Sequence, residues 1–314
     1  MTIRVKTIFY KGWEKAIEIS NSEIKIIVVP EVGRILHFGF LNADNIFYKN
    51  KTLEGLTFKN GAYFTENNII LAPNIGGNRV LPCSEDYFHL ITGSRHVPDP
   101  FINASEYKAT ILKNGVVLKS PISNLLGIQI IRKITVNEFD TTVKINQELI
   151  KIKPALTPVL EKIPLTIWSL SKIKTPNVSY TKLAKNSIFK NGFTISEWPD
   201  AQNYAEENAS VKNNLLTLKS SDEFPQKIGT DSRNWVAGYL NDTLFIEKFN
   251  FEEEKIYPDK GTSVTIFGND MFSELECLSP EKELKINDKI SYNLSWNLEK
   301  VTNKEKATQF LKKL

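Results

Sequence analysis

The stretch YKATILKNGVVLKS, residues 107–120, holds two short runs typical of β-strands, separated by Asn114-Gly115. Asn-Gly is favoured in type I′ turns, because both positions accept positive φ angles and the turn matches the twist of its flanking strands. We therefore predict a β-hairpin here, with a type I′ turn at Asn114-Gly115.

Similar short β-type runs, separated by turns of two to four residues, recur from residue 15 to residue 298. The further predicted hairpins pair 16–19 with 24–29, 37–40 with 45–49, 130–136 with 141–149, 187–190 with 193–198 around Asn191-Gly192, and 235–240 with 244–249 around Asn241-Asp242. Loops are expected at 153–164 and 220–229. Because the hairpins follow one another without alternating helices, the predicted fold class is all-β, with large antiparallel sheets packed face to face in a sandwich.

The C-terminal segment 303–314 is the one stretch with a helical pattern. Ala307, Phe310, Leu311 and Leu314 fall on one stripe, and Asn303 is the expected N-cap. No long or low-complexity linker interrupts the chain. We therefore expect a single domain over residues 1–314, with its core at about 15–298 and the helix as a tail.

The composition limits the classes of partner. The 314 residues are 41% hydrophobic, and 40 basic against 36 acidic residues give a net charge of +4. That excess is small and dispersed, which argues against nucleic acid as a partner. No stretch approaches the roughly 18 apolar residues of a membrane span, and the N-terminus lacks the pattern of a signal peptide. Cys83 and Cys277 lack metal-binding spacing. We expect a cytoplasmic protein with no bound metal.

Five groups of residues resemble, in their order and spacing, the galactose mutarotase-like (aldose 1-epimerase-like) superfamily, and most closely its branch grouped as a domain of unknown function, DUF4380. They are residues 24–40 with Pro30-Glu31-Val32-Gly33-Arg34, 73–79 followed by 96–100, 165–170, 227–231 followed by Trp235, and 257–261 with 272–280. The resemblance implies a β-supersandwich whose concave face binds a sugar. It also implies a cofactor-free reaction, in which a carboxylate removes the proton of the anomeric hydroxyl and a histidine protonates the ring oxygen.

Glu274 and Glu276 are the candidates for the carboxylate. Strand alternation places Phe272, Glu274 and Glu276 on one face and the more apolar Leu275 and Cys277 on the other. A partly apolar groove or a neighbouring acid can raise a carboxyl pKa toward neutrality, which suits a general base. The motif match makes Glu274 the first choice for the base and Glu276 the second. The alternative is a solvated strand face bearing ordinary acids.

His96 is the candidate for the acid, because its place in the chain order matches that of the acid histidine in mutarotases. The usual His-Gly-Gly surroundings are missing, however, and the site of a second histidine holds Trp168-Ser169 instead. His37 and His89 are expected to be structural.

Eight residues are expected to bind the substrate by charge, hydrogen bonding or stacking: Arg34, Asn78, Arg79, Asp99, Trp168, Lys227, Tyr257 and Asp259. The alternatives are turn chemistry for the aspartates and core packing for the aromatic residues. Arg34, Arg79 and Lys227 would favour an anionic sugar over a neutral one.

The sequence thus predicts a carbohydrate-binding, mutarotase-like protein, with interconversion of sugar anomers as its reaction. Two alternatives stay open, because a fold does not fix a function. One is a sugar-binding protein that has lost the acid histidine. The other is a lyase or hydrolase that acts on uronate-containing glycans.

Overall fold

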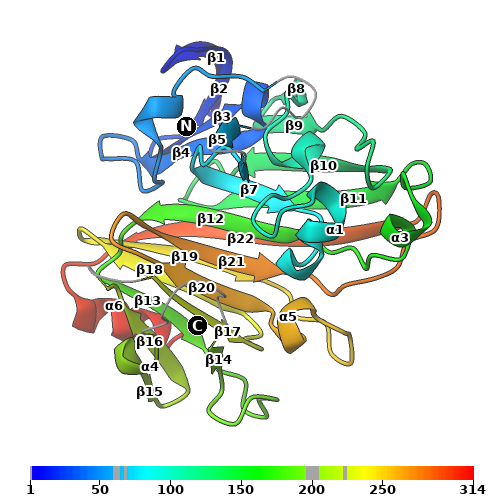
Figure 1. The fold of residues 1–314 in the computed structure, drawn as a ribbon. Coiled ribbons are helices and arrows are strands. Elements are labelled where there is room, and N and C mark those ends of the chain that lie inside the picture. The colour runs from blue at the N-terminus through cyan, green and yellow to red at the C-terminus, as the bar shows by residue number, and fades with distance from the viewer. Residues whose placement is uncertain (1, 59–63, 67–68, 196–204, 222–224) are drawn as a thin grey trace.

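A computed structural model describes residues 2–58, 64–66, 69–195, 205–221 and 225–314. In these residues two ten-stranded antiparallel sheets pack face to face (Figure 1), and β5 (Phe64–Glu66) pairs separately with β6 (Ile69–Leu71). Strands make up 46% of the structure and helices 13%. The predicted all-β sandwich of large antiparallel sheets is confirmed.

We call the sheet that carries the candidate site the site sheet, and the other the support sheet. The site sheet has the order β1 (Arg4–Tyr10), β2 (Trp13–Ser20), β3 (Ile24–Val29), β4 (Arg34–Phe40), β7 (Gly77–Leu81), β12 (Trp168–Lys174), β21 (Phe272–Leu278), β20 (Val264–Gly268), β17 (Gln226–Thr230) and β14 (Thr194–Ile195). The support sheet has the order β15 (Ala209–Lys212), β16 (Leu215–Lys219), β13 (Val178–Lys182), β18 (Trp235–Leu240), β19 (Thr243–Phe249), β22 (Lys289–Lys300), β11 (Val143–Lys151), β10 (Ile128–Val136), β9 (Gly115–Lys119) and β8 (Lys108–Leu112).

The helices are short. The 3₁₀ turns are η1 (Pro30–Val32), η2 (Lys51–Leu53) and η4 (Glu85–Tyr87), and the α-helices are α1 (Phe88–Thr92), α2 (Pro100–Asn103), α3 (Pro158–Glu161), α4 (Ala205–Asn208), α5 (Pro258–Gly261) and α6 (Lys304–Leu311). In the described chain no helix is long and apolar enough to cross a membrane.

The main core lies between the two sheets. The ring of Phe38 on β4 lies 5.9 Å from that of Phe245 on β19 and 5.6 Å from that of Trp296 on β22, measured between ring centroids. On the site sheet, Ile173 and Leu275 belong to this same buried cluster. Because consecutive residues on a strand point to opposite faces, the residues that precede and follow Ile173 and Leu275 point away from the core. That second face, which we call the outer face, carries the candidate site.

Four predicted hairpins are confirmed: β2–β3, β8–β9, β10–β11 and β18–β19. The turn between β8 and β9 differs from the prediction, because Leu112 pairs with Gly115 and neither intervening residue has a positive φ. The predicted type I′ turn is therefore wrong. Gly115 is a strand residue, where a Cβ atom would lie 2.0 Å from the Ile134 carbonyl oxygen of β10. The glycine permits this close approach of two backbones.

Two predicted hairpins do not form. Residues 187–190 are not a strand, because Ser187 Oγ and Ile188 N donate hydrogen bonds to the Asp231 carboxylate. Of the predicted partner segment 193–198, only β14 is a strand among the described residues, and it pairs with β17. Residues 196–198 lie outside the described residues. Residues 45–49 form only single bridges, from Phe47 and Lys49, to other segments.

The predicted loop at 220–229 is also wrong at its end, because β17 begins at Gln226. By contrast, the predicted C-terminal helix is confirmed as α6. The Asn303 side chain accepts a hydrogen bond from Lys306 N at 2.9 Å, as expected of an N-cap. Ala307 and Leu311 are buried, in a cluster that includes Trp235 of the support sheet.

Candidate functional site

Strand register builds two rows of side chains on the outer face of the site sheet. Residues that pair directly across an antiparallel sheet point to the same face. The first row is Lys172, Glu274, Phe267 and Lys227. The second row is Arg79, Leu170, Glu276, Thr265, Gly229 and Thr194. The rows run side by side across β12, β21, β20 and β17, so ionisable groups from distant parts of the chain become neighbours.

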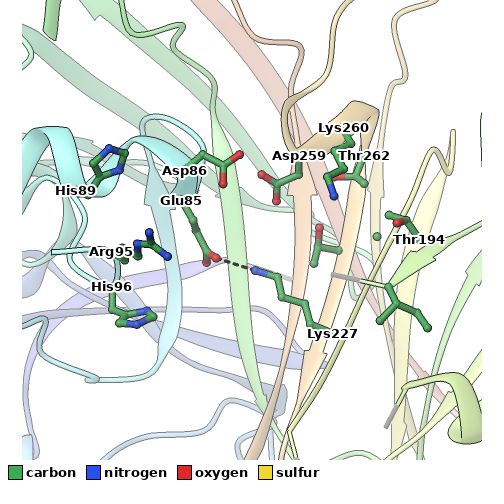
Figure 2. Close-up of a pocket in the computed structure, with 13 residues that line it drawn as sticks. Glu85, Asp86, His89, Arg95, His96, Thr194, Lys227, Asp259, Lys260 and Thr262 are labelled. Carbon is green, nitrogen blue, oxygen red and sulfur yellow. Dashed lines mark hydrogen bonds and ion pairs between the residues drawn. The ribbon is translucent and has the colours of Figure 1, made fainter. Parts of the chain in front are cut away.

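A cavity of about 420 Å³ lies over one end of the second row. It is lined by Glu85, Asp86, His89, Arg95, His96, Thr194, Ile195, Lys227, Gly229, Asp259, Lys260, Thr262 and Thr265. In Figure 2 the segment from Glu85 to His96 forms one wall, and Asp259 and Lys260 lie on the opposite side. Between them Lys227 Nζ lies 2.9 Å from Glu85 Oε2. Thr265 on β20 and Gly229 on β17 line the cavity from the site sheet, and we call them its floor.

The wall formed by α5 is strained. Asp259 (φ 50°) and Lys260 (φ 63°) both adopt left-handed conformations, which cost a residue with a side chain roughly 1–2 kcal/mol each. Asp259 Oδ1 accepts a hydrogen bond from Ser84 Oγ at 2.7 Å. Burial raises the pKa of Asp259, although this hydrogen bond and Lys227 oppose the shift. Strain of this kind is often found where a backbone must place side chains at a site.

Glu276 stands next to Thr265 in the second row, directly beyond the cavity floor. Its side chain is fully buried, and Oε2 accepts a hydrogen bond from Trp168 Nε1 at 2.8 Å. Oε1 has no hydrogen-bond partner among the described residues. Burial raises the pKa of Glu276 well above its usual value; Lys227 opposes the shift, while nearby carboxylates reinforce it. This glutamate therefore holds its proton more tightly than an ordinary one.

Glu274 shares the strand and the face of Glu276 but has different neighbours. Its Oε1 lies 2.9 Å from Lys172 Nζ and 3.9 Å from Arg79 Nη2. Burial favours the neutral acid, but these two cations outweigh it, so the pKa of Glu274 lies below its usual value. Lys172 Nζ also donates to Asn74 Oδ1 at 2.6 Å, and burial lowers the pKa of Lys172 to about 8.

The two arginines and the asparagine of the predicted site lie on two paired strands, Arg34 on β4 and Asn78 and Arg79 on β7. Arg34 is buried and donates to Gly76 O at 3.0 Å and to Asn103 O and Oδ1 at 3.1 Å. Arg79 Nη1 donates to the same Asn103 Oδ1 at 3.0 Å. Asn78 precedes Arg79 on the strand and therefore points the other way, where its side chain meets Arg132 inside the sandwich. The structure does not bring Asn78 to the outer face.

Asp99, Tyr257 and Trp168 have partners within the protein. The fully buried Asp99 caps α2, accepting a hydrogen bond from Phe101 N at 2.9 Å, and burial raises its pKa to about 6. The ring of Tyr257 stacks on Phe251 with 4.7 Å between centroids. Trp168 is fully buried against Glu276. None of these three lines the cavity.

Of the predicted residues, the structure brings His96, Lys227 and Asp259 together on the cavity walls. Glu276 and Trp168 lie beyond the floor, and Arg79 and Glu274 continue the same face. His37 is buried on β4, as expected, whereas the prediction that His89 is structural does not match its exposed place in the cavity wall. In the described part of the chain, no group of three or more His, Cys, Asp or Glu side chains could hold a metal ion.

Sequence reasoning missed several residues of this face. Lys172 could have been found, because it is four residues after Trp168 on one strand and so shares its face. Glu85 and Asp86 come from η4, Arg95 from a turn and Lys260 from α5, and no spacing in the sequence places them at the cavity.

Several solved structures share this fold. A galactose mutarotase-like protein from Lactobacillus casei superposes with a TM-score of 0.55 and 9% identity, over 90% of this chain and 100% of that one. A galactose mutarotase related enzyme from Lactobacillus acidophilus gives 0.54 and 9%, over 92% and 98%. A candidate aldose 1-epimerase from Klebsiella pneumoniae gives 0.56 and 10%, over 99% and 86%. No protein-family model matches the sequence, and no curated protein matches it. The likeness shows a galactose mutarotase-like fold.

Proposed function

We propose that this protein binds a sugar in the outer-face cavity and interconverts its anomers without a cofactor. The observation that carries the proposal is the pair Glu274 and Glu276, two residues apart on one face, with pKa values shifted in opposite directions. Neighbouring carboxyl groups with divided roles are typical of acid–base sites.

Glu276 is the better general base of the two, which reverses the order of preference from the sequence. It adjoins the cavity floor, its Oε1 is uncommitted among the described residues, and its raised pKa makes its carboxylate a stronger base. Lys227 beside it stabilises the ionised form. The carboxylate of Glu274 is occupied by Lys172 and has a lowered pKa, which makes it a weak base.

The reaction needs two proton transfers. Glu276 takes the proton of the anomeric hydroxyl while the bond between the anomeric carbon and the ring oxygen breaks, and the ring oxygen receives a proton. His96, on the cavity wall, is the donor in this proposal. Rotation of the resulting aldehyde and the reverse transfers close the ring to the other anomer.

The fold shared with mutarotases and aldose 1-epimerases supports this proposal. Placement in the DUF4380 branch, a single domain over residues 1–314 and a cytoplasmic location are parts of the same proposal. One observation favours a second candidate, a protein that only binds sugar. By the sequence resemblance, Trp168 stands where mutarotases have a second histidine; it is fully buried and donates its N–H to Glu276.

Exchange spectroscopy by NMR separates the two candidates. Wild-type protein is added to a panel of neutral and acidic aldoses, and anomer exchange is compared with that in buffer and with a His96→Asn variant. We expect exchange above the buffer rate for at least one sugar, and a slower rate in the variant. Binding of a sugar with exchange no faster than in buffer would reject the enzyme and support the binding protein.

A further inference from the structure

Positive charge is in excess on the outer face around β7, where the second row begins. Arg34, Arg79 and Lys172 lie together there with Glu274, and we call these four residues the Arg79 cluster. Among the described residues, Glu274 is the one carboxylate within ion-pair distance of Arg79 and Lys172, and no carboxylate lies within that distance of Arg34. The side chains of Arg79, Glu274 and Lys172 are only 17%, 13% and 7% exposed. Burying a charge without a counter-ion costs free energy, so we expect a negatively charged partner to balance this excess.

Several donors of the cluster are unused. Arg34 donates only to uncharged oxygens, of Gly76 and Asn103. The Nε atoms of Arg34 and Arg79 are buried and have no hydrogen-bond partner in the described structure. At 3.9 Å, the contact from Arg79 Nη2 to Glu274 is too long for a hydrogen bond. The guanidinium of Arg79 is therefore held in place but not saturated.

Asn103 holds it. Its Oδ1 accepts hydrogen bonds from both Arg34 Nη2, at 3.1 Å, and Arg79 Nη1, at 3.0 Å. One neutral amide oxygen thus keeps two cations side by side without cancelling their charge. The surroundings on β17 differ, because there Glu85 already neutralises Lys227.

We infer that the Arg79 cluster is a subsite for an oxyanion, either a carboxylate or a phosphate group carried by the sugar, and that Asn103 positions Arg79 to bind it. A guanidinium fork matches the geometry of both groups. The part of this inference that concerns a sugar rests on the proposed function, whereas the part that concerns an oxyanion does not. Residues two apart on a strand are about 6.6 Å apart, so Glu274, next to Arg79, is within one sugar unit's reach of Glu276.

The test compares ligands by calorimetry at constant ionic strength. The probes are inorganic phosphate, a hexose 6-phosphate, a hexuronate and the corresponding neutral hexose. We expect phosphate to bind, and one of the two acidic sugars to bind at least about tenfold more tightly than the neutral hexose, in line with charge-assisted hydrogen bonds. Which acidic sugar binds more tightly identifies the oxyanion. Equal affinity for the acidic and neutral sugars, with no binding of phosphate, would overturn the inference.

Asn103→Asp is the most informative variant, because it keeps the shape of the side chain and places a carboxylate between the two arginines. It should lower oxyanion affinity at least about tenfold and leave neutral hexose binding unchanged. Arg233→Met, which removes a surface arginine paired with Glu253, is the matched control and should change neither. Asn103→Asp with undiminished oxyanion binding would refute the positioning role. If no sugar binds but phosphate does, the proposed function fails and the subsite stands.

Discussion

Glu274 and Glu276 lie on the same strand and face, yet their surroundings are opposite. Around Glu274, cations outnumber carboxylates, since Lys172 and Arg79 face one acid. Around Glu276, carboxylates outnumber cations, since Glu274, Glu85 and Asp259 raise its pKa and Lys227 lowers it. The difference comes from the neighbouring strands and turns. Position on a strand sets the direction of a side chain, whereas the partners brought by the sheet set its chemistry.

The largest expected effect is on stability at Glu274. Glu274→Gln leaves two largely buried cations without a counter-charge, so we expect a loss of about 3 kcal/mol in the free energy of unfolding. Glu276→Gln should change it by less than about 1 kcal/mol, because a group with a raised pKa already tends toward the neutral form. Urea denaturation of both variants measures the difference. Equal losses would mean that the two surroundings are not opposite.

The next effect is on catalysis at Glu276. Glu276→Gln should lower the rate of anomer exchange at least about a hundredfold and leave sugar affinity nearly intact, because only proton transfer is lost. Glu274→Gln should lower the exchange rate by less than this, when the variant is assayed under conditions in which it is folded. The reverse result, with Glu274→Gln inactive and Glu276→Gln active, would move the base to Glu274.

The pH dependence of stability should divide between the two residues. The lowered pKa of Glu274 adds stability above its unfolded pKa, and this is lost as the pH falls through the folded value. The raised pKa of Glu276 acts in the opposite sense, so its contribution is present at low pH and is lost as the pH rises through the folded value. Glu274→Gln should therefore flatten the acid side of the stability curve, and Glu276→Gln the alkaline side, in thermal unfolding across pH.

The smallest expected effects come from the neighbours of Glu276. Lys227→Met should move the base-dependent limb of the pH–rate profile to higher pH, because Lys227 opposes the raised pKa. Trp168→Phe removes one hydrogen bond to the carboxylate and should lower the rate by no more than about tenfold. A profile that is unchanged in Lys227→Met would show that Glu276 is not the titrating base.

Local signals in the sequence predicted four hairpins correctly, β2–β3, β8–β9, β10–β11 and β18–β19. Alternation also placed Glu274 and Glu276 on a common face, and the capping pattern predicted α6. Two of the failures involve glycines, which occur both in turns and at close approaches within sheets. Gly115 was assigned to a turn, but it lies in a strand where two backbones approach closely. Gly229 fell within the loop predicted at 220–229, but it lies in β17, where a Cβ atom would be 2.4 Å from Thr262 Cγ2.

The site was less predictable, because its contacts join strands that are distant in the chain. Strand alternation predicts that Glu276 shares a face with Glu274, but not that Trp168 donates to it across 108 residues. The resemblance drew attention to Asn78 and Asp99, but the structure uses the first inside the sandwich and the second as a helix cap. The charges that distinguish the two glutamates depend on sheet order, which hairpin signals do not specify.

That sheet order has a consequence for how the protein folds. In the site sheet β12 pairs with β7 on one side and with β21 on the other, and the Lys227–Glu85 contact spans 142 residues. Contacts of such long sequence separation are entropically costly to form, and chains rich in them fold slowly. The hairpins can form early, but the two rows of side chains exist only once the whole sheet has closed. Sugar binding should therefore be among the last properties to appear during refolding, and no fragment that lacks β21 should show it.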